Sequence, residues 1–319
     1  MPINENLAAF SDLAFRTAFL IYFLAFCLLI GQYATSRVNK VEARELVGVG
    51  AGSAVPGRVI EAPAKSLSER LGNMSVSVLV VGFASHIASI VLRGFATERF
   101  PLGNMYEFVT MACAAAVAVG LVIMRGQKYR SMWVFLLPPV MILMFLAATV
   151  LYADAAPVVP ALRSYWLPIH VTIVSVGSGV FMVAGVASVL YLLRMRQPAG
   201  SEADGFVGKI ARRLPDAQTL DRLAYKTTII GFPLFGAGVI LGAIWAESAW
   251  GRFWGWDPKE TMAFIAWVIY AAYLHARATS GWRDTKAAWI NVAGFVAMIF
   301  NLFVINMVVQ GLHSYAGLT

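Results

Sequence analysis

Long apolar runs separated by short polar segments make up most of the 319 residues. A run of about 20 apolar residues is long enough to cross a bilayer as a helix. A segment in lipid has to satisfy its own backbone hydrogen bonds, so these runs are expected to be helical. The pattern predicts an all-α fold, a polytopic integral membrane helical bundle of about eight transmembrane helices. The runs cover approximately residues 14–34, 73–92, 105–124, 132–151, 168–193, 227–246, 260–277 and 287–310.

Composition and charge fit a protein whose solvent is the lipid bilayer. Hydrophobic residues make up 59% of the chain and charged residues only 13%. Nineteen of the 25 Lys and Arg residues lie in alternate connecting segments, which indicates that these segments are cytoplasmic. The net charge of +8 is therefore an orientation signal, and no nucleic-acid partner is expected. The basic segments are 35–72, 125–131, 194–226 and 277–286.

The same charge pattern predicts the topology. Both termini and a Trp-rich loop at about 247–260 are expected on the extracytoplasmic side of the plasma membrane. The first run lacks the basic start of a cleavable signal peptide, so it is expected to remain as an anchor. The chain then divides into an N-terminal anchor helix with its cytoplasmic loop, 1–72, and a membrane domain, 73–319. Cys27 and Cys113 form no Cys-x-x-Cys pair, which excludes a dithiol carrier.

The Trp-rich loop interrupts the apolar pattern between the sixth and seventh runs. Four of the nine Trp residues fall between Trp245 and Trp256. Indoles this close together, with Gly spacers, form a wide aromatic face that suits a flat apolar ligand such as a porphyrin. The alternative is an aromatic belt at a membrane interface, which accounts for one or two Trp residues at a helix end. A belt accounts less well for the Asp-Pro-Lys-Glu continuation at 257–260.

The stretch Trp-Gly-Arg-Phe-Trp-Gly-Trp-Asp-Pro-Lys-Glu-Thr at 250–261 resembles the "WWD" signature of a haem-handling family. That family includes the cytochrome c assembly proteins CcsA (also called ResC), CcmC and CcmF. Tyr-Leu-His-Ala-Arg at 273–277 and Gly-Leu-His-Ser-Tyr at 311–315 resemble the CcsA branch, the system II type. The resemblance is clearest from about residue 73 to the end.

This resemblance implies a role in cytochrome c biogenesis. Proteins of the CcsA type are expected to move haem b to the outer face of the membrane and to present it to the Cys-x-x-Cys-His motif of apocytochrome c. They act with a CcsB/ResB-type membrane protein, so the chain is expected to be one subunit of a holocytochrome c synthase, or haem lyase. The loop that presents the haem is expected to use Trp250, Trp254, Trp256 and Asp257.

Two of the four histidines are predicted at the height of the Trp-rich loop. His170 begins the fifth run and His313 follows the eighth, both at their outer ends. This topology permits two imidazoles to hold one iron from opposite faces, and histidine is a common axial ligand of haem. The resemblance implies that His170 and His313 are the axial ligands of an external haem. The alternative is a pair of interface histidines without a metal.

His275 and His86 lie within membrane runs, where a histidine is costly and is a functional candidate. The resemblance assigns His275 to a haem site inside the membrane, with a histidine at the inner interface as the alternative. His86 lies roughly 20 Å above the inner start of its run, about 15 Å from the depth of His275. Either the predicted boundary of a run is misplaced, or another protein supplies the second axial ligand of the haem that His275 binds. His86 is kept as a candidate haem-binding residue.

Charged residues near the outer surface complete the predicted site. Haem propionates need cationic partners, and Arg252 is the preferred one. Asp257 and Glu260 are expected to brace the loop, with Asp257 as a helix N-cap. Glu107 is expected to hold a cation or Arg93, with a simple helix N-terminal charge as the alternative. The other outward candidates for the propionates are Arg93, Arg99, Arg163 and Lys259.

Three other functions remain open at this point. A quinol-oxidising b-type cytochrome would need paired histidines on facing helices at matched depths, and the matched pair here lies at the outer ends. A haem exporter would bind haem without maturing cytochrome c. An ion-coupled carrier would bind no haem at all.

Gly238 and Gly242 share one helix face at small-xxx-small spacing and predict close helix packing.

Overall fold

The computed structural model describes residues 3–35, 66–157, 162–309 and 311–313. These residues form helices and no β-strand, which confirms the predicted all-α fold. A 3-10 turn, η1 (Gln127–Tyr129), and the short helix α7 (Phe206–Ala211) lie in connections. The long helices are α1 (Glu5–Thr35), α3 (Leu67–Thr97), α4 (Met105–Ile123), α5 (Arg130–Thr149), α6 (Trp166–Arg196), α8 (Ala217–Trp250), α9 (Pro258–Ala278) and α10 (Thr285–Met307).

A long helix occupies each of the eight predicted runs, and seven of these helices are long and apolar enough to cross a membrane. The exception is α9, whose first turn carries Lys259 and Glu260 and whose last turn carries His275 and Arg277. Helix α9 packs against α8 and α10. The fold is therefore that of a multi-pass integral membrane protein in which one long helix is polar at both ends.

Polar caps explain why several helices extend beyond the apolar runs. The Ser66 side chain accepts a hydrogen bond from the Glu69 N–H while the Glu69 carboxylate accepts one from the Ser66 N–H, so α3 begins at Leu67. Asp216 accepts from the Thr219 N–H and starts α8 ten residues before the predicted run. Such caps satisfy N–H groups that have no partner within the helix. The lipid-facing part of each helix is thus shorter than the helix itself.

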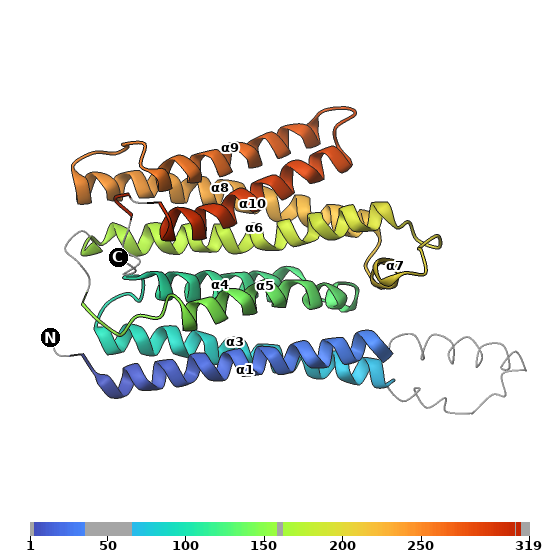
Figure 1. Cartoon of the computed structure of the whole chain (residues 1–319), viewed down its shortest axis with the longest axis horizontal. Helices are drawn as coiled ribbons and strands as arrows, with labels where there is room; N and C mark the ends of the chain where they lie inside the picture. The colour runs from blue at the N-terminus through green and yellow to red at the C-terminus, as the bar shows by residue number, and fades with distance from the viewer. Residues whose placement is uncertain (1–2, 36–65, 158–161, 310, 314–319) are drawn as a thin grey trace, which may run out of the picture.

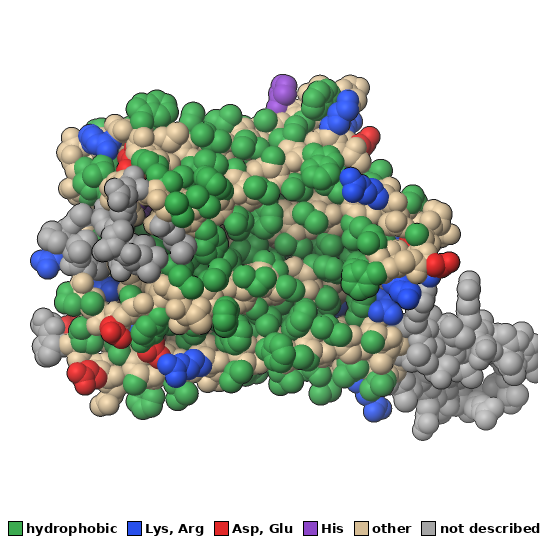
Figure 2. Space-filling view, viewed as in Figure 1, with side chains coloured by type: hydrophobic (Ala, Val, Ile, Leu, Met, Phe, Trp, Pro, Cys, Tyr) green, Lys and Arg blue, Asp and Glu red, His purple; other side chains and the backbone are tan. Residues whose placement is uncertain are grey.

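The long helices lie side by side in successive layers (Figure 1). Helices α1 and α3 pair along one edge, α4 and α5 follow, α6 lies in the middle, and α8, α9 and α10 form the opposite edge. The largest buried cluster joins α1 and α3 with α4, α5 and α6. Hydrophobic side chains also cover the outer surface (Figure 2), where Leu20 is 64% and Ile240 65% exposed. An apolar exterior of this kind is what contact with lipid requires.

The connections gather at the two ends of the bundle in the predicted alternation (Figure 1). The start of α1, the turn before α4, the Trp-rich loop and the end of α10 share one end, while η1, α7 and the α9–α10 turn share the other. At the first end the Asn4 N–H donates to the Ala96 carbonyl at 3.0 Å. Which end faces the cytoplasm, and in which membrane, stays a prediction. Most of the loop 35–72 and the residues after His313 lie outside the described residues.

Candidate functional site

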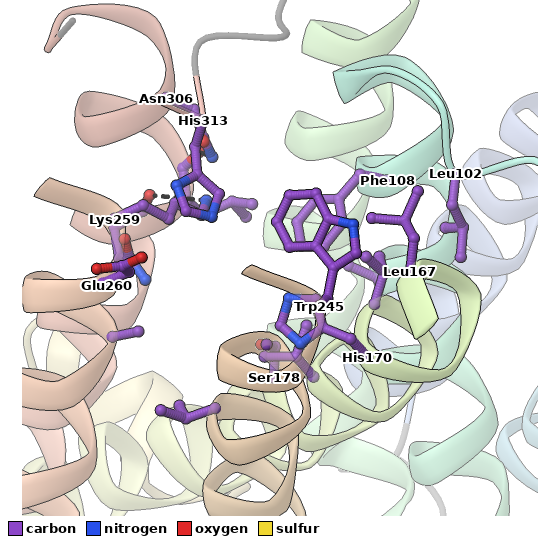
Figure 3. A pocket seen from close by; sticks show the side chains of 18 of the residues that line it. Leu102, Phe108, Leu167, His170, Ser178, Trp245, Lys259, Glu260, Asn306 and His313 are labelled. Atoms are coloured by element: carbon purple, nitrogen blue, oxygen red, sulfur yellow. Dashed lines mark hydrogen bonds between the residues drawn. The ribbon is translucent and has the colours of Figure 1, made fainter. Parts of the chain in front are cut away.

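A cavity opens at the end of the bundle that carries the Trp-rich loop (Figure 3). It holds about 1360 Å³ of space between atoms, part of it open to solvent, and its walls come from α4, α6, α8, α9, α10 and the loop. Most of the lining is apolar, with a few convergent polar groups, the pattern expected of a small-molecule site. The polar lining includes Asn104, His170, Ser178, Lys259, Glu260, Asn301, Asn306 and His313.

His170 stands near the start of α6 and lines the cavity. Its Nδ1 lies 2.7 Å from the carbonyl oxygen of Gly238 on α8. Because a carbonyl only accepts, Nδ1 carries the proton and Nε2 keeps its lone pair in the neutral ring. Gly242 leaves room for this imidazole, since a Cβ there would come within 2.7 Å of Cε1. A Cβ at Gly238 would likewise come within 3.0 Å of Val174 on α6. The close packing of α6 and α8 that the sequence predicts therefore also positions His170.

Trp245 is not among the residues predicted for the site, yet its ring contacts those of His170 and His313, the two candidate ligands of the haem iron (Figure 3). Its indole is 2% exposed and lies parallel to the His170 ring at 6.1 Å between centroids. The His313 ring meets it edge-on at 5.7 Å. In the sequence, Gly238, Gly242 and Trp245 follow the i, i+4, i+7 spacing of one helix face. This spacing is the sequence signal that could have identified Trp245 as a residue of the site.

His313 lies beyond the end of α10 and reaches back to the first turn of α9. Its Nδ1 is 2.7 Å from Oδ2 of Asp257, and its ring is 5.0 Å from that of Trp250. The Leu312 N–H donates to Oδ1 of the same carboxylate at 2.7 Å. Gly311 permits this close passage, because a Cβ there would come within 2.7 Å of Oδ1. The carboxylate of Asp257 therefore anchors the segment that carries His313.

Asp257 is the N-cap of α9, as the Asp-Pro sequence predicts. Its carboxylate accepts from the Lys259 N–H at 3.3 Å, and Oε2 of Glu260 accepts from the Asp257 N–H at 3.1 Å. Burial alone would raise the pKa of Asp257, but the hydrogen bonds from His313 and from the Leu312 and Lys259 N–H groups outweigh it. The pKa of Asp257 therefore lies below its usual value. The charged carboxylate is thus part of the folded site.

The three tryptophans predicted for the loop occupy different positions. Trp254 lines the cavity and meets the ring of Trp256 edge-on at 5.7 Å. Trp250 lies behind the lining, against Trp245 at 4.8 Å and against His313. Trp256 is 68% exposed and has a left-handed backbone with φ of 57°, which is uncommon for a bulky residue. It projects from the loop and does not line the cavity.

Arg252 and Glu260 brace the loop. Nη1 of Arg252 lies 3.9 Å from Oε2 of Glu260, which also accepts from the Gly255 N–H at 2.9 Å. The guanidinium packs directly on Gly255, where a Cβ would coincide with it. Arg252 is not among the residues that line the cavity. The cation predicted for the propionates is therefore already paired with a carboxylate of the loop.

Lys259 differs from Arg252 because it is among the residues that line the cavity. Nζ lies 3.4 Å from the Asn301 carbonyl oxygen and 5.7 Å from the centre of the Phe108 ring. In the part of the chain that the structure describes, Lys259 forms no ion pair. Figure 3 shows Lys259, Glu260 and His313 on one wall, facing Trp245 and His170 on the other.

The wall formed by the turn before α4 is held by what we call the outer ion cluster, Arg93, Arg99 and Glu107. Arg99 donates from Nη1 and Nη2 to the two oxygens of Glu107 at 2.8 and 3.1 Å, and Arg93 adds a contact from Nε at 3.1 Å. The Gly103 N–H donates to the same carboxylate at 2.7 Å. The expectation that Glu107 holds Arg93 is confirmed. Gly103 lines the cavity, so the cluster shapes its wall.

The remaining two histidines lie away from this cavity. His86 on α3 is 0% exposed, and its Nδ1 is 3.2 Å from the Tyr22 hydroxyl. His275 is exposed near the end of α9, at the opposite edge of the bundle (Figure 1). The two rings therefore do not meet within this chain, in line with their different predicted depths. A haem-ligand role stays a prediction for both.

Comparison with known proteins identifies the class to which this site belongs. Residues 102–313 match the model of the cytochrome C assembly protein family, and the chain belongs to that family. The matched region includes both walls of the cavity and ends at His313.

Curated relatives narrow the class to the CcsA type. The cytochrome c biogenesis protein CcsA of Gloeobacter violaceus is 32% identical over 297 residues, covering 78% of this chain and 88% of the relative. CcsA of Mesostigma viride is 33% identical over 258 residues, covering 74% and 85%. The chain is a CcsA-type protein of cytochrome c biogenesis, and that role implies that it handles haem.

The solved structure of the cytochrome c haem lyase CcmF has a similar fold. Its TM-score is 0.64 at 16% sequence identity, and the match covers 99% of this chain but half of the longer CcmF chain. At this identity the likeness concerns the helical fold alone.

Proposed function

We propose that the cavity receives haem between His170 and His313 and presents it to apocytochrome c. The observation that carries the proposal is that both imidazoles line one cavity with Nδ1 bonded to a fixed acceptor, a backbone carbonyl for His170 and a carboxylate for His313. Histidines that bind metals usually have such a partner on the other ring nitrogen, because it fixes the ring orientation. Nε2 would then be the ligand atom of each.

The aromatic surroundings suit the flat ring of haem b. Trp245 and Trp254 line the cavity, and Trp250 supports Trp245 from behind. In the proposed reaction each cysteine thiol of the Cys-x-x-Cys-His motif adds across a vinyl group. The S–H bond and the C=C π bond break, and a C–S bond and a C–H bond form, so no oxidant is needed. The protein contributes orientation, which is catalysis by positioning. Trp256 is exposed next to Trp254 and suits contact with the incoming polypeptide.

His275 supports the proposal of a membrane partner of the CcsB/ResB type. It is exposed on α9, whose surface also exposes Ile265 and Val268 at 42% and 44%. A polar ring on a lipid-facing surface is costly unless another protein covers it. A partner histidine would then complete a second haem site. Co-expression with the partner tests this point. In the purified complex, His275→Ala should lose the haem of the second site and keep the haem of the cavity.

Purification in detergent and a pyridine haemochrome spectrum test the proposed function. We expect haem in the wild type and its loss from the cavity in a His170→Ala, His313→Ala double variant, with the elution profile unchanged. A colourless wild type would contradict the proposal and favour an ion-coupled carrier. Co-expression with the partner and a Cys-x-x-Cys-His reporter separates a synthase from an exporter, because only a synthase yields covalently attached haem.

A further inference from the structure

Lys259 is a partly buried lysine that lines the cavity and has no carboxylate within ion-pair distance among the described residues. We propose that its ammonium group binds a propionate carboxylate of the haem and makes the cavity selective for porphyrins with a free carboxylate. This inference rests on the proposed function, because it names the part of the ligand that the cavity recognises.

The surroundings of Nζ provide weak compensation for its charge. The hydrogen bond to the Asn301 carbonyl is long, at 3.4 Å, and the Phe108 ring offers a cation–π contact at 5.7 Å. A buried charge is costly unless it is paired and hydrogen-bonded. The Asp257 carboxylate is engaged by His313 and by the Leu312 N–H, at 2.7 Å each. An anionic ligand group would therefore be stabilised beside Lys259.

Asn301 provides a second, independent indication of a ligand. It is 7% exposed, it lines the cavity, and its side-chain oxygen has no hydrogen-bond partner among the described residues. Buried polar groups are hydrogen-bonded in most proteins, so an unpartnered amide beside a cation points to a polar ligand group. Rotation of the amide turns its NH₂ group toward the position of the oxygen, which lets Asn301 donate to a carboxylate.

The other predicted partners of the propionates, Arg93, Arg99, Arg163 and Arg252, are not among the residues that line the cavity, and Arg163 is exposed. Arg93 and Arg99 share the Glu107 carboxylate, and Arg252 is 3.9 Å from Glu260 and lies outside the lining. Lys259 therefore has the role that was expected of Arg252. Glu260 is also part of the lining; its Oε2 accepts from two backbone N–H groups and lies 3.9 Å from Nη1 of Arg252, and its Oε1 has no hydrogen-bond partner among the described residues.

The test compares haem with its dimethyl ester, in which both propionates are capped and uncharged. Binding of each to the full-length, detergent-purified chain is followed by Soret titration. We expect the wild type to prefer haem, and Lys259→Met to weaken haem binding by roughly 10- to 100-fold, the range for a charged hydrogen bond. Ester binding should be unchanged, which shows that the variant is folded. Lys259→Arg should restore part of the preference.

Arg163→Met is the matched control, because it removes an exposed cation before α6 that does not line the cavity and holds no part of the loop. It should leave the ratio of haem to ester affinity unchanged. If Lys259→Met retains the full preference for haem, or if Arg163→Met abolishes it, the assignment of Lys259 is wrong while the haem site stands. If the wild type binds neither compound, the proposed function itself fails.

Discussion

Two polar groups of residues lie at the same end of the bundle, on either side of the cavity, and they differ in how their charges are matched. In the outer ion cluster, Arg93 and Arg99 converge on one carboxylate, whose side chain is 1% exposed. In the loop, Asp257 and Glu260 are held mainly by N–H groups and by His313, and Lys259 forms no ion pair within the described residues. In the first group every charged side chain has an ion-pair partner, and in the second Lys259 has none among the described residues.

This difference separates a structural role from a binding role. A buried carboxylate that accepts from two guanidinium groups and a backbone N–H has no capacity left for a ligand. Its effect on the cavity is indirect, through the position of Gly103. In the loop, the same kinds of side chain orient His313 and present Lys259 to the cavity. Variants on the two sides should therefore change different measurements.

The largest effect is expected from Glu107→Ala, which leaves Arg93 and Arg99 without their common partner. Removal of one member of a buried ion pair costs about 3–5 kcal/mol. Thermal unfolding in detergent should show this loss as a lower midpoint. Glu107→Gln keeps hydrogen bonds to part of the cluster and should cost less. Equal midpoints for Glu107→Ala and the wild type would remove the distinction between the two groups.

Asp257→Asn should act on haem binding more than on unfolding. The partner of a metal-bound histidine typically contributes 10- to 100-fold in affinity, so we expect a loss of roughly that size. The measurement is a haem titration at neutral pH, compared with Glu247→Gln, an exposed carboxylate on the last turn of α8. A variant that binds haem as tightly as the wild type would show that His313 does not depend on this carboxylate.

The pH dependence of stability gives a second measure of Asp257. Its folded-state pKa is below the unfolded value of about 3.9. The unfolded state therefore binds the proton more tightly, and the stabilisation is present above that value and is lost as the pH falls through the folded pKa. We expect a constant contribution between about pH 5 and 8 and a loss below about pH 4. Because Asn does not titrate, the Asp257→Asn variant should lose less stability than the wild type when the pH falls below about 4.

Gly242→Ala should have a smaller effect, limited to the His170 side of the cavity. The new Cβ would come within 2.7 Å of the imidazole, so the ring or α8 has to shift. Overpacking of this kind costs about 1–3 kcal/mol. Haem affinity should fall, whereas Gly205→Ala, where a Cβ meets nothing within 4 Å, should leave it unchanged. Unchanged affinity for Gly242→Ala would show that the cavity does not need this imidazole position.

The sequence predicts the helices of this fold well, because each depends on local apolar runs and on caps such as Asp257. It also predicts that His170 and His313 share one end of the bundle, since both follow from topology. It does not predict that Trp245 contacts both imidazole rings, or that Lys259 rather than Arg252 lines the cavity. Those facts depend on contacts between helices far apart in the chain, such as Lys259 with Asn301 across 42 positions. Periodicity carries no information about such pairs.

The smallest effect is expected from Tyr22→Phe, which tests the position of His86 in the α1–α3 pair. The substitution removes the hydroxyl that lies 3.2 Å from Nδ1 of His86 and keeps the ring, so the cost is that of one buried hydrogen bond, about 1 kcal/mol. His86→Leu removes the imidazole itself. Because His86 is fully buried and does not line the cavity, neither variant should change the haem titration of the cavity, although both lower the unfolding midpoint. If His86→Leu abolished a haem signal that Tyr22→Phe retained, His86 would be a haem ligand. The α1–α3 pair would then bind haem as well, and haem binding would not be confined to the helices that line the cavity.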